Sequence, residues 1–161
     1  YVPVTVIKKD EQHGLGSAQE FVEEELLNPL DDPVKKIEPS DMFNCAFFDA
    51  IIGNEDRHYK NFLMRAKDRS PVLIDHGLAF PEADTPDWPR SIFLNIIQAS
   101  IVRTPIKGTH KVKLKELIAD EPRIRKKLAP LLESAALDGI FWRMRKMLET
   151  DDYSFGLIWE R

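Results

Sequence analysis

The feature of this sequence that most constrains its fold is an apolar run from Met42 to Ile52. Its large apolar side chains are Phe43, Phe47, Phe48, Ile51 and Ile52. A run this apolar has to be buried, and we predict a helix that ends at Gly53, because glycine suits the left-handed conformation that closes helices. Ser40 is the expected N-cap, and Asp41 is expected in the first turn.

Polar loops surround two shorter apolar runs that follow this helix. Phe62-Leu63-Met64 and Val72-Leu73-Ile74 are joined by a charged turn, and we predict that they pair as a β-hairpin. The loop from Asn54 to Lys60 precedes the hairpin, and Asp75-His76-Gly77 follows it. Because the apolar runs must be buried, these loops are held rigidly, which is how proteins usually present catalytic groups.

The rest of the chain predicts a mostly helical α+β fold with a short β-containing start. Val2–Ile7 and Ser17–Val22 favour a small hairpin, although the second segment can instead open a helix. We predict a helix over Ser91–Val102 and a wholly helical region from Lys111 onward, with one helix starting at Asp120.

Composition excludes several classes of protein. The 161 residues contain one cysteine, Cys45, so neither an internal disulfide nor a cysteine-rich zinc site can form. A reducing compartment, and hence a cytoplasmic location, is the expectation. No apolar stretch approaches the 18 residues of a membrane span, and no signal peptide is visible. The chain does not begin with Met, so we expect it to be a fragment or to lack an N-terminal part.

Charge is distributed unevenly along the chain. The net charge is −4, but the first two thirds are acidic and the last third is basic, with the positive groups concentrated between Lys107 and Lys127. We interpret this basic segment as the solvated face of a helical region. It contains few aromatic residues, so a nucleic-acid partner is not expected.

The loops around the hairpin have the spacing required for phosphoryl transfer. A kinase needs an aspartate that receives the proton of the attacking hydroxyl, an asparagine five positions later that holds Mg²⁺, and a second aspartate on a turn beyond a hairpin. Here Asp56 is followed five positions later by Asn61, and Asp75 comes fourteen residues after that. Asp75-His76-Gly77 occupies the place of the Asp-Phe-Gly motif.

Two segments resemble known kinases. Gly53-Asn54-x-Asp56-Arg57-His58-x-x-Asn61-Phe62 is similar to the catalytic loop of HipA-type toxin kinases and of phosphatidylinositol 3-/4-kinases. Ile74-Asp75-His76-Gly77-Leu78-Ala79-Phe80-Pro81 resembles the metal-binding segment of phosphatidylinositol 4-kinases and their bacterial relatives. The resemblance covers roughly residues 41–81. It implies an atypical kinase fold. It also implies an ATP- and Mg²⁺-dependent kinase, that is, a phosphotransferase that transfers the phosphoryl group to an alcohol acceptor.

The resemblance also implies roles for individual residues. Asp56 corresponds to the catalytic aspartate, and Asn61 and Asp75 correspond to the residues that bind Mg²⁺ and, through it, ATP. Arg57 and His58 would brace the loop or meet phosphate charge. Lys60 lies between the aspartate and the asparagine, where its charge would neutralise the transferring phosphoryl group.

Asp49 and His76 lie beside these motifs. Asp49 precedes the loop by one helical turn, and we expect it to fix Arg57 or His58. His76 replaces the aromatic residue of Asp-Phe-Gly, and we expect it to pack rather than to react.

The chain departs from a complete kinase at its start. No G-x-G-x-x-G loop is present, and Gly14-Leu15-Gly16 is the only close glycine pair. Lys8 is an alternative candidate for the lysine that pairs the ATP phosphates, but only seven residues precede it, too few for two strands and a phosphate loop. We therefore interpret residues 1–28 as a remnant of N-lobe strands and hinge, 29–39 as a connector, and 40–161 as a kinase-like C-lobe.

Three alternatives stand beside an active kinase. The chain can be a catalytically inactive kinase-derived binding module that lacks the phosphate-binding N-lobe. It can be a metal-dependent hydrolase that uses Asp56, His58, Asp75 and His76. The same loop residues can also be structural turns and caps.

The acceptor is constrained by the segment after Asp75-His76-Gly77. Residues 81–89 contain Glu82, Asp84 and Asp87 and no basic residue before Arg90, which argues against a phosphoinositide. The expected partners are ATP and a protein or small hydroxyl acceptor.

Overall fold

The computed structural model describes residues 2–12, 14–23, 36–82, 90–99 and 105–153. These residues form an α+β fold, as predicted, with most of the regular structure in helices. The strands are β1 (Thr5–Asp10), β2 (Gly14–Gln19), β3 (Phe62–Met64) and β4 (Pro71–Leu73). The helices are α1 (Pro39–Ile52), α2 (Ile92–Ala99), α3 (Gly108–Ala119), α4 (Glu121–Leu128) and α5 (Ser134–Thr150).

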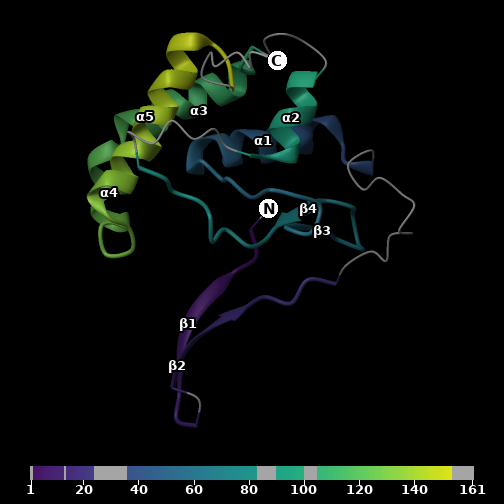
Figure 1. Ribbon diagram of the computed structural model, residues 1–161, viewed down its shortest axis with the longest axis vertical. Coiled ribbons are helices and arrows are strands. Elements are labelled where there is room, and N and C mark those ends of the chain that lie inside the picture. The colour runs from purple at the N-terminus through teal and green to yellow at the C-terminus, as the bar shows by residue number, and fades with distance from the viewer. Residues whose placement is uncertain (1, 13, 24–35, 83–89, 100–104, 154–161) are drawn as a thin grey trace.

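The β1–β2 hairpin extends away from the helical body (Figure 1). Its strands pair antiparallel, from Thr5 opposite Gln19 to Asp10 opposite Gly14. Gly14 has a φ of 80°, a left-handed conformation that glycine adopts at little cost, and it opens the second strand. The predicted N-terminal hairpin is confirmed, with both strands shifted by about three residues.

Helix α1 forms where the apolar run predicted it, and its C-terminus is closed as expected. Gly53 has a φ of 63° in the left-handed region, and its N–H donates to the carbonyl oxygen of Asp49. The predicted N-cap is wrong, because Glu38 occupies the N-cap position and Ser40 lies inside the helix. Pro39 explains the earlier start, since proline is favoured in the first turn, where no N–H donor is required.

The second hairpin places the two loops of interest beside each other. Strands β3 and β4 pair antiparallel, with Phe62 opposite Leu73 and Met64 opposite Pro71. This register confirms the predicted hairpin and brings Asn61, just before β3, opposite Ile74, just after β4.

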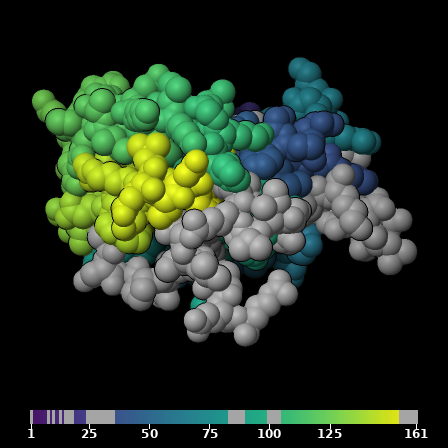
Figure 2. Space-filling view, turned by 90° about the horizontal axis from the view of Figure 1, so that it is seen from above, coloured from purple at the N-terminus to yellow at the C-terminus, as the bar shows by residue number. Residues whose placement is uncertain are grey.

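Three helices make up the C-terminal part of the described chain. Figure 2 shows α3, α4 and α5, in green and yellow, as one block beside α1 in blue. Helix α5 contacts α1, α3 and α4. The region predicted to be helical from Lys111 begins slightly earlier, at Gly108. Asp120 occupies the N-cap position of α4, as predicted, although its side chain makes no capping hydrogen bond.

The core joins α1 and α2 to α5 and to the β3–β4 hairpin. Phe47, Phe93 and Phe141 are buried in one cluster that also contains Met64. Cys45 on α1 has no exposed surface, and burial raises its pKa to about 12, so the thiol is unreactive at neutral pH.

A polar triad ties the end of the described chain to α1. Nδ1 of His110 lies 2.7 Å from the Tyr153 hydroxyl, and Nε2 lies 2.9 Å from Oδ1 of Asn44. The imidazole ring stacks on Phe47, with ring centroids 4.1 Å apart. Burial lowers the pKa of His110, so the neutral ring is favoured inside the fold.

Several predictions fall on residues outside the described ranges or are not tested by the fold. Residues 29–35 of the predicted connector and 83–89 of the acidic segment are not described. The division into 1–28, 29–39 and 40–161 therefore stays a prediction. Among the described residues, no helix is both long enough and apolar enough to span a membrane.

Phe93 tests whether α2 is held to the hairpin by the core. It has no exposed surface, and its ring lies 5.1 Å from that of Phe62 between centroids. Phe93→Ala should lower the free energy of unfolding by about 3–5 kcal/mol, because it leaves a cavity. Val112→Ala on the exposed side of α3 should change it by less than about 0.5 kcal/mol. Denaturant unfolding measures both, and equal small effects would contradict this account.

Candidate active site

A buried ion pair lies beneath the loop that follows α1. Asp49 and Arg57 are 0% and 2% exposed, and Nη2 of Arg57 lies 3.2 Å from Oδ1 of Asp49. Nε of Arg57 also donates to Oδ2 of Asp49 at 3.2 Å. The hydroxyl of Ser91 donates to the same carboxylate at 2.7 Å, so the aspartate binds Arg57 and α2 together. The expectation that Asp49 fixes Arg57 is confirmed.

The charge of Asp49 is maintained against its burial. Burial raises the pKa of Asp49, and the Arg57 guanidinium opposes the shift together with donors from Ser91 and Asn54. An ionised carboxylate in a dry environment is stable only when it is paired and hydrogen-bonded. Removal of any one partner therefore leaves buried charge or unpaired donors at this point of the fold.

Arg57 also connects the loop to the hairpin. Its Nη1 donates to the carbonyl oxygen of Asn61 and, at 2.6 Å, to that of Ile74. The N–H of Ile74 in turn donates to the carbonyl oxygen of Asn61 at 3.1 Å. These contacts describe a bracing role for Arg57, the first of the two predicted for it.

Asp56, Asn61 and Asp75 lie around this brace. Nδ2 of Asn61 donates to the Asp56 carbonyl oxygen at 2.7 Å and to Oδ2 of Asp56 at 3.2 Å. The N–H of Asp56 donates to Oδ1 of the buried Asn54 at 3.0 Å, which fixes the loop from its other side. Asp75 follows Ile74 directly, is exposed and has a φ of 51°. The structure thus brings Asp56 and Asn61 into contact and places Asp75 one residue beyond the carbonyl that Arg57 binds, but the chemical roles of all three stay predictions.

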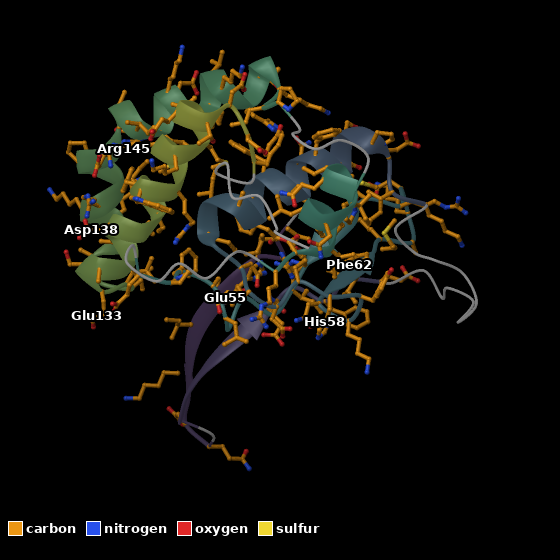
Figure 3. All side chains as sticks on the ribbon, turned by 45° about the horizontal axis from the view of Figure 1, so that its top comes forward. Glu55, His58, Phe62, Glu133, Asp138 and Arg145 are labelled. Carbon is orange, nitrogen blue, oxygen red and sulfur yellow. The ribbon has the colours of Figure 1, made fainter. Side chains whose placement is uncertain are left out.

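His58 and Lys60 lie on the exposed side of the loop. Figure 3 shows His58 and Glu55 beneath α1, toward the β1–β2 hairpin. Nε2 of His58 lies 3.8 Å from Oδ1 of Asp56, and their side chains are 51% and 44% exposed. Nδ1 of His58 accepts a hydrogen bond from the backbone N–H of Lys60 at 3.1 Å, so Nε2 is the nitrogen that carries the proton when the ring is neutral.

His76 packs against α1. Its ring meets Phe48 edge to face, with centroids 5.7 Å apart, and burial lowers its pKa. This geometry agrees with the expected packing role. Among the described residues, no three His, Cys, Asp or Glu side chains lie close enough together to hold a metal ion. The four residues of the hydrolase alternative are therefore not assembled as a metal site.

Two cavities flank the loop. The first, of about 590 Å³, lies between the segment after β2 and the β3–β4 hairpin. It is lined by Pro3, Gln19, Glu20, Phe21, Val22, Glu23, Leu63 and Ile74. The second, of about 330 Å³, lies on the Asp56 side of the loop. It is lined by Glu55, Asp56, Arg57, His58, Tyr59, Arg90, Ile92 and Asn95.

Sequence reasoning missed several residues of this site. Ser91 bonds Asp49 across 42 residues, and the backbone of Arg57 bonds Arg90 and Ile92 on either side of it. No local pattern marks Ser91, because serine is common at helix starts for other reasons. Asn54 was inside the loop motif and received no role, although its position before the aspartate was a usable signal.

Comparison with known proteins adds a family to this geometry. The family described as "Golgi casein kinase, C-terminal, Fam20" matches residues 28–150, more than half of the chain. The chain belongs to the Fam20 family. The prediction that the chain belongs to an atypical kinase family is therefore confirmed, and the family match indicates a kinase-like domain. The match is to Fam20 rather than to HipA-type or phosphatidylinositol kinases.

The chain is also similar to a human relative. It is 29% identical over 135 residues to the Homo sapiens glycosaminoglycan xylosylkinase. The alignment covers 74% of this chain and 31% of the relative. The chain thus spans about a third of the length of that relative. No solved structure matches the chain significantly.

The Asp49–Arg57 pair predicts a large stability effect from a nearly isosteric change. Asp49→Asn leaves the Arg57 guanidinium buried without its anion, and we expect a loss of about 3–5 kcal/mol in the free energy of unfolding. Asp138→Asn breaks the exposed pair with Arg125 and should cost less than about 1 kcal/mol. Urea unfolding of the two variants compares them, and similar losses would show that the buried pair is not a principal support.

Proposed function

We propose that this chain is the catalytic part of an ATP- and Mg²⁺-dependent phosphotransferase of the Fam20 type. The observation that carries the proposal is the single guanidinium of Arg57, which bonds the carbonyl oxygens of both Asn61 and Ile74. It joins the Asp56 loop to the residue that precedes Asp75. A loop of structural turns has no need of this connection, whereas phosphoryl transfer requires both aspartates at fixed positions.

Asp56 is the group that meets the acceptor. Its Oδ2 is bonded by Asn61, while its Oδ1 faces the exposed side of the loop. An acceptor hydroxyl bonded to this carboxylate attacks the γ-phosphorus of ATP. The new oxygen–phosphorus bond forms, the bond to the ADP oxygen breaks, and the hydroxyl proton passes to Asp56. Lys60 and His58 are exposed beside this position and contribute positive charge or a hydrogen-bond donor.

Asn61 and Asp75 supply oxygen atoms suited to Mg²⁺. The Asn61 amide nitrogen is engaged by Asp56, so its carbonyl oxygen is the atom that remains for a cation. Asp75 contributes an exposed carboxylate. Mg²⁺ in nucleotide sites takes one or two protein ligands, with phosphates and water completing its shell, so these residues fit it. When bound, the ion neutralises charge on the phosphates.

The larger cavity suits the base of the nucleotide. Its apolar wall contains Leu63 from β3 and Ile74 beside β4. Its opposite wall is the segment after β2, which we predicted to lead into the hinge. Ala66 donates its N–H to the carbonyl oxygen of Glu23 at 3.0 Å, which links the two walls. A nucleotide base in this cavity would place its phosphates toward Asp75.

The smaller cavity is the proposed acceptor site. Asp56 forms part of its wall together with Tyr59, Arg90 and Asn95, which are exposed. The family description names casein, a protein, and the human relative's name indicates a xylosyl group. Both carry hydroxyl acceptors, in agreement with the predicted protein or small hydroxyl acceptor.

The N-terminal hairpin supports the predicted division into lobes. Val4 and Val6 on one face and Ile7 on the other are 67%, 45% and 72% exposed. Apolar side chains on both faces of a two-stranded hairpin need further strands or helices to cover them. We propose that these strands belong to an N-lobe, as in HipA-type and phosphatidylinositol kinases, with residues 40–161 as the C-lobe.

Two other aspects of the function stay predictions. An inactive binding module would share this fold, but the retained Asp56, Asn61 and Asp75 favour activity. A cytoplasmic location rests on the single cysteine, whereas the family description names the Golgi.

Asp75 gives the direct test of phosphoryl transfer. Asp75→Asn should abolish Mg²⁺-dependent ATP turnover, because it removes the charged ligand, and leave the unfolding midpoint nearly unchanged, because Asp75 is exposed. Asp68→Asn, exposed in the hairpin turn, is the matched control. Turnover that survives Asp75→Asn in full would refute the proposed function.

Phe21 tests the proposed nucleotide cavity. It is 90% exposed and lines the cavity, so Phe21→Ala should leave stability unchanged and weaken ATP binding, by about 1–3 kcal/mol if its ring stacks on the base. Val6→Ala, exposed on the hairpin outside the cavity, should leave binding unchanged. The rise in melting temperature with added ATP and Mg²⁺ reports both affinities. Equal shifts for wild type and Phe21→Ala would place the base elsewhere.

A further inference from the structure

A second buried arginine, Arg143 on α5, reaches the loops from the opposite side. It is 4% exposed, and its Nε donates to the carbonyl oxygen of Ile51 at 2.9 Å. Its Nη1 donates to the carbonyl oxygen of Pro81 at 3.1 Å. One side chain therefore bonds the last turn of α1 and the segment that follows Asp75-His76-Gly77.

The guanidinium fits directly against the backbone of Gly53. A Cβ atom on this residue would lie 2.9 Å from Cζ of Arg143 and 2.8 Å from Cδ of Pro81. Any side chain at this position would displace the arginine or the proline. The glycine that closes α1 is thus required for the contact as well as for its φ of 63°.

Arg143 forms no ion pair within 4.0 Å in the part of the chain that the structure describes, and its buried Nη2 has no hydrogen-bond partner there. Burial lowers its pKa to about 10, the more distant carboxylate of Glu55 opposes this shift, and the guanidinium is still protonated at neutral pH. The C-terminal carbonyls of a helix attract cations, and the Ile51 carbonyl is one of these. A neutral side chain would not gain this attraction.

The bonded segment is held in a conformation that needs support. Phe80 has a φ of 67° and Asp75 a φ of 51°, so two non-glycine residues in the left-handed region bound the segment. Such conformations persist only where surrounding contacts enforce them. Phe80 donates its N–H to Ile52 at 2.7 Å, and Glu55 donates to Leu78 at 2.9 Å. These two bonds run alongside the contact that Arg143 makes with Pro81.

We propose that Arg143 is a positioning residue that sets the separation of Asp56 from Asp75. It holds the segment after Asp75 against the end of α1, and the Asp56 loop begins at that same end. Arg57 fixes the two loops at the hairpin, and Arg143 fixes them at the helix, so the loops are held at both ends. The inference rests on the proposed phosphotransferase function for its kinetic consequence but not for its structural one.

Arg143→Lys is the first test, because it keeps the charge and loses the paired donors. Amide hydrogen exchange should become at least about tenfold faster at Phe80 and Glu55, whose bonds lie beside the lost contact, and stay unchanged at Ile74. In the phosphotransferase assay, kcat should fall at least about tenfold, with KM for ATP within about threefold of wild type. Arg145→Lys, on the exposed side of the same helix, is the control and should change neither.

A second variant and the two readouts keep the outcomes distinct. Arg143→Gln keeps one donor without the charge and should show the same local exchange if Arg143→Lys does not fold. Uniformly faster exchange across the chain would show a merely structural role, and unchanged exchange at Phe80 and Glu55 would show that Arg143 does not hold the segment. Either result would overturn the inference. If wild type transfers no phosphate, the proposed function fails, and the exchange data alone decide whether Arg143 holds the segment.

Discussion

The ion pair between Asp49 and Arg57 is the interaction on which the rest of the site depends. The pair is buried, and its partners come from three separate parts of the chain: the end of α1, the loop after it and the start of α2. The same guanidinium then bonds two carbonyl oxygens at the mouth of the β3–β4 hairpin. A buried charge of this kind adds little net stability compared with an apolar core, but moving any of its partners leaves a charge or a donor unpaired. The site requires fixed positions for these groups more than it requires additional stability.

The local features of the fold could be predicted because each rests on a short-range rule. The apolar run of α1 ending at Gly53 follows from burial and left-handed capping, and the hairpin follows from two apolar runs joined by a charged turn. The sequence spacing of Asp56, Asn61 and Asp75 also has a counterpart in the fold, because the hairpin brings Asn61 opposite Ile74, the residue before Asp75. These features span few residues, so local chemistry determines them.

The features that could not be predicted depend on distance. Ser91 meets Asp49 across 42 residues, and Arg143 meets Ile51 across 92. Neither residue lies in a distinctive pattern, and a serine or an arginine on a helix is normally read as a cap or a solvated charge. The helix start was mispredicted for a different reason, since Ser40 is a good cap but Pro39 is a better first residue. Membership of the Fam20 family agrees with the motif-based prediction, although the motifs alone pointed to other atypical kinases.

The triad of His110, Tyr153 and Asn44 has a consequence for the behaviour of the protein in acid. Oδ1 of Asn44 accepts a hydrogen bond from the Nε2–H group, so Nδ1 of the neutral ring accepts a hydrogen bond from the Tyr153 hydroxyl. A protonated His110 ring would carry an N–H donor at Nδ1, facing the Tyr153 hydroxyl that donates to this nitrogen in the neutral state. Because the pKa of His110 is lowered in the fold, the unfolded chain takes up the proton first, and stability is lost as the pH falls below the ordinary value of 6.5. Mild acid should therefore loosen the junction of α1, α3 and the end of α5, and with it the support that this junction gives to the helix from which the Asp56 loop emerges.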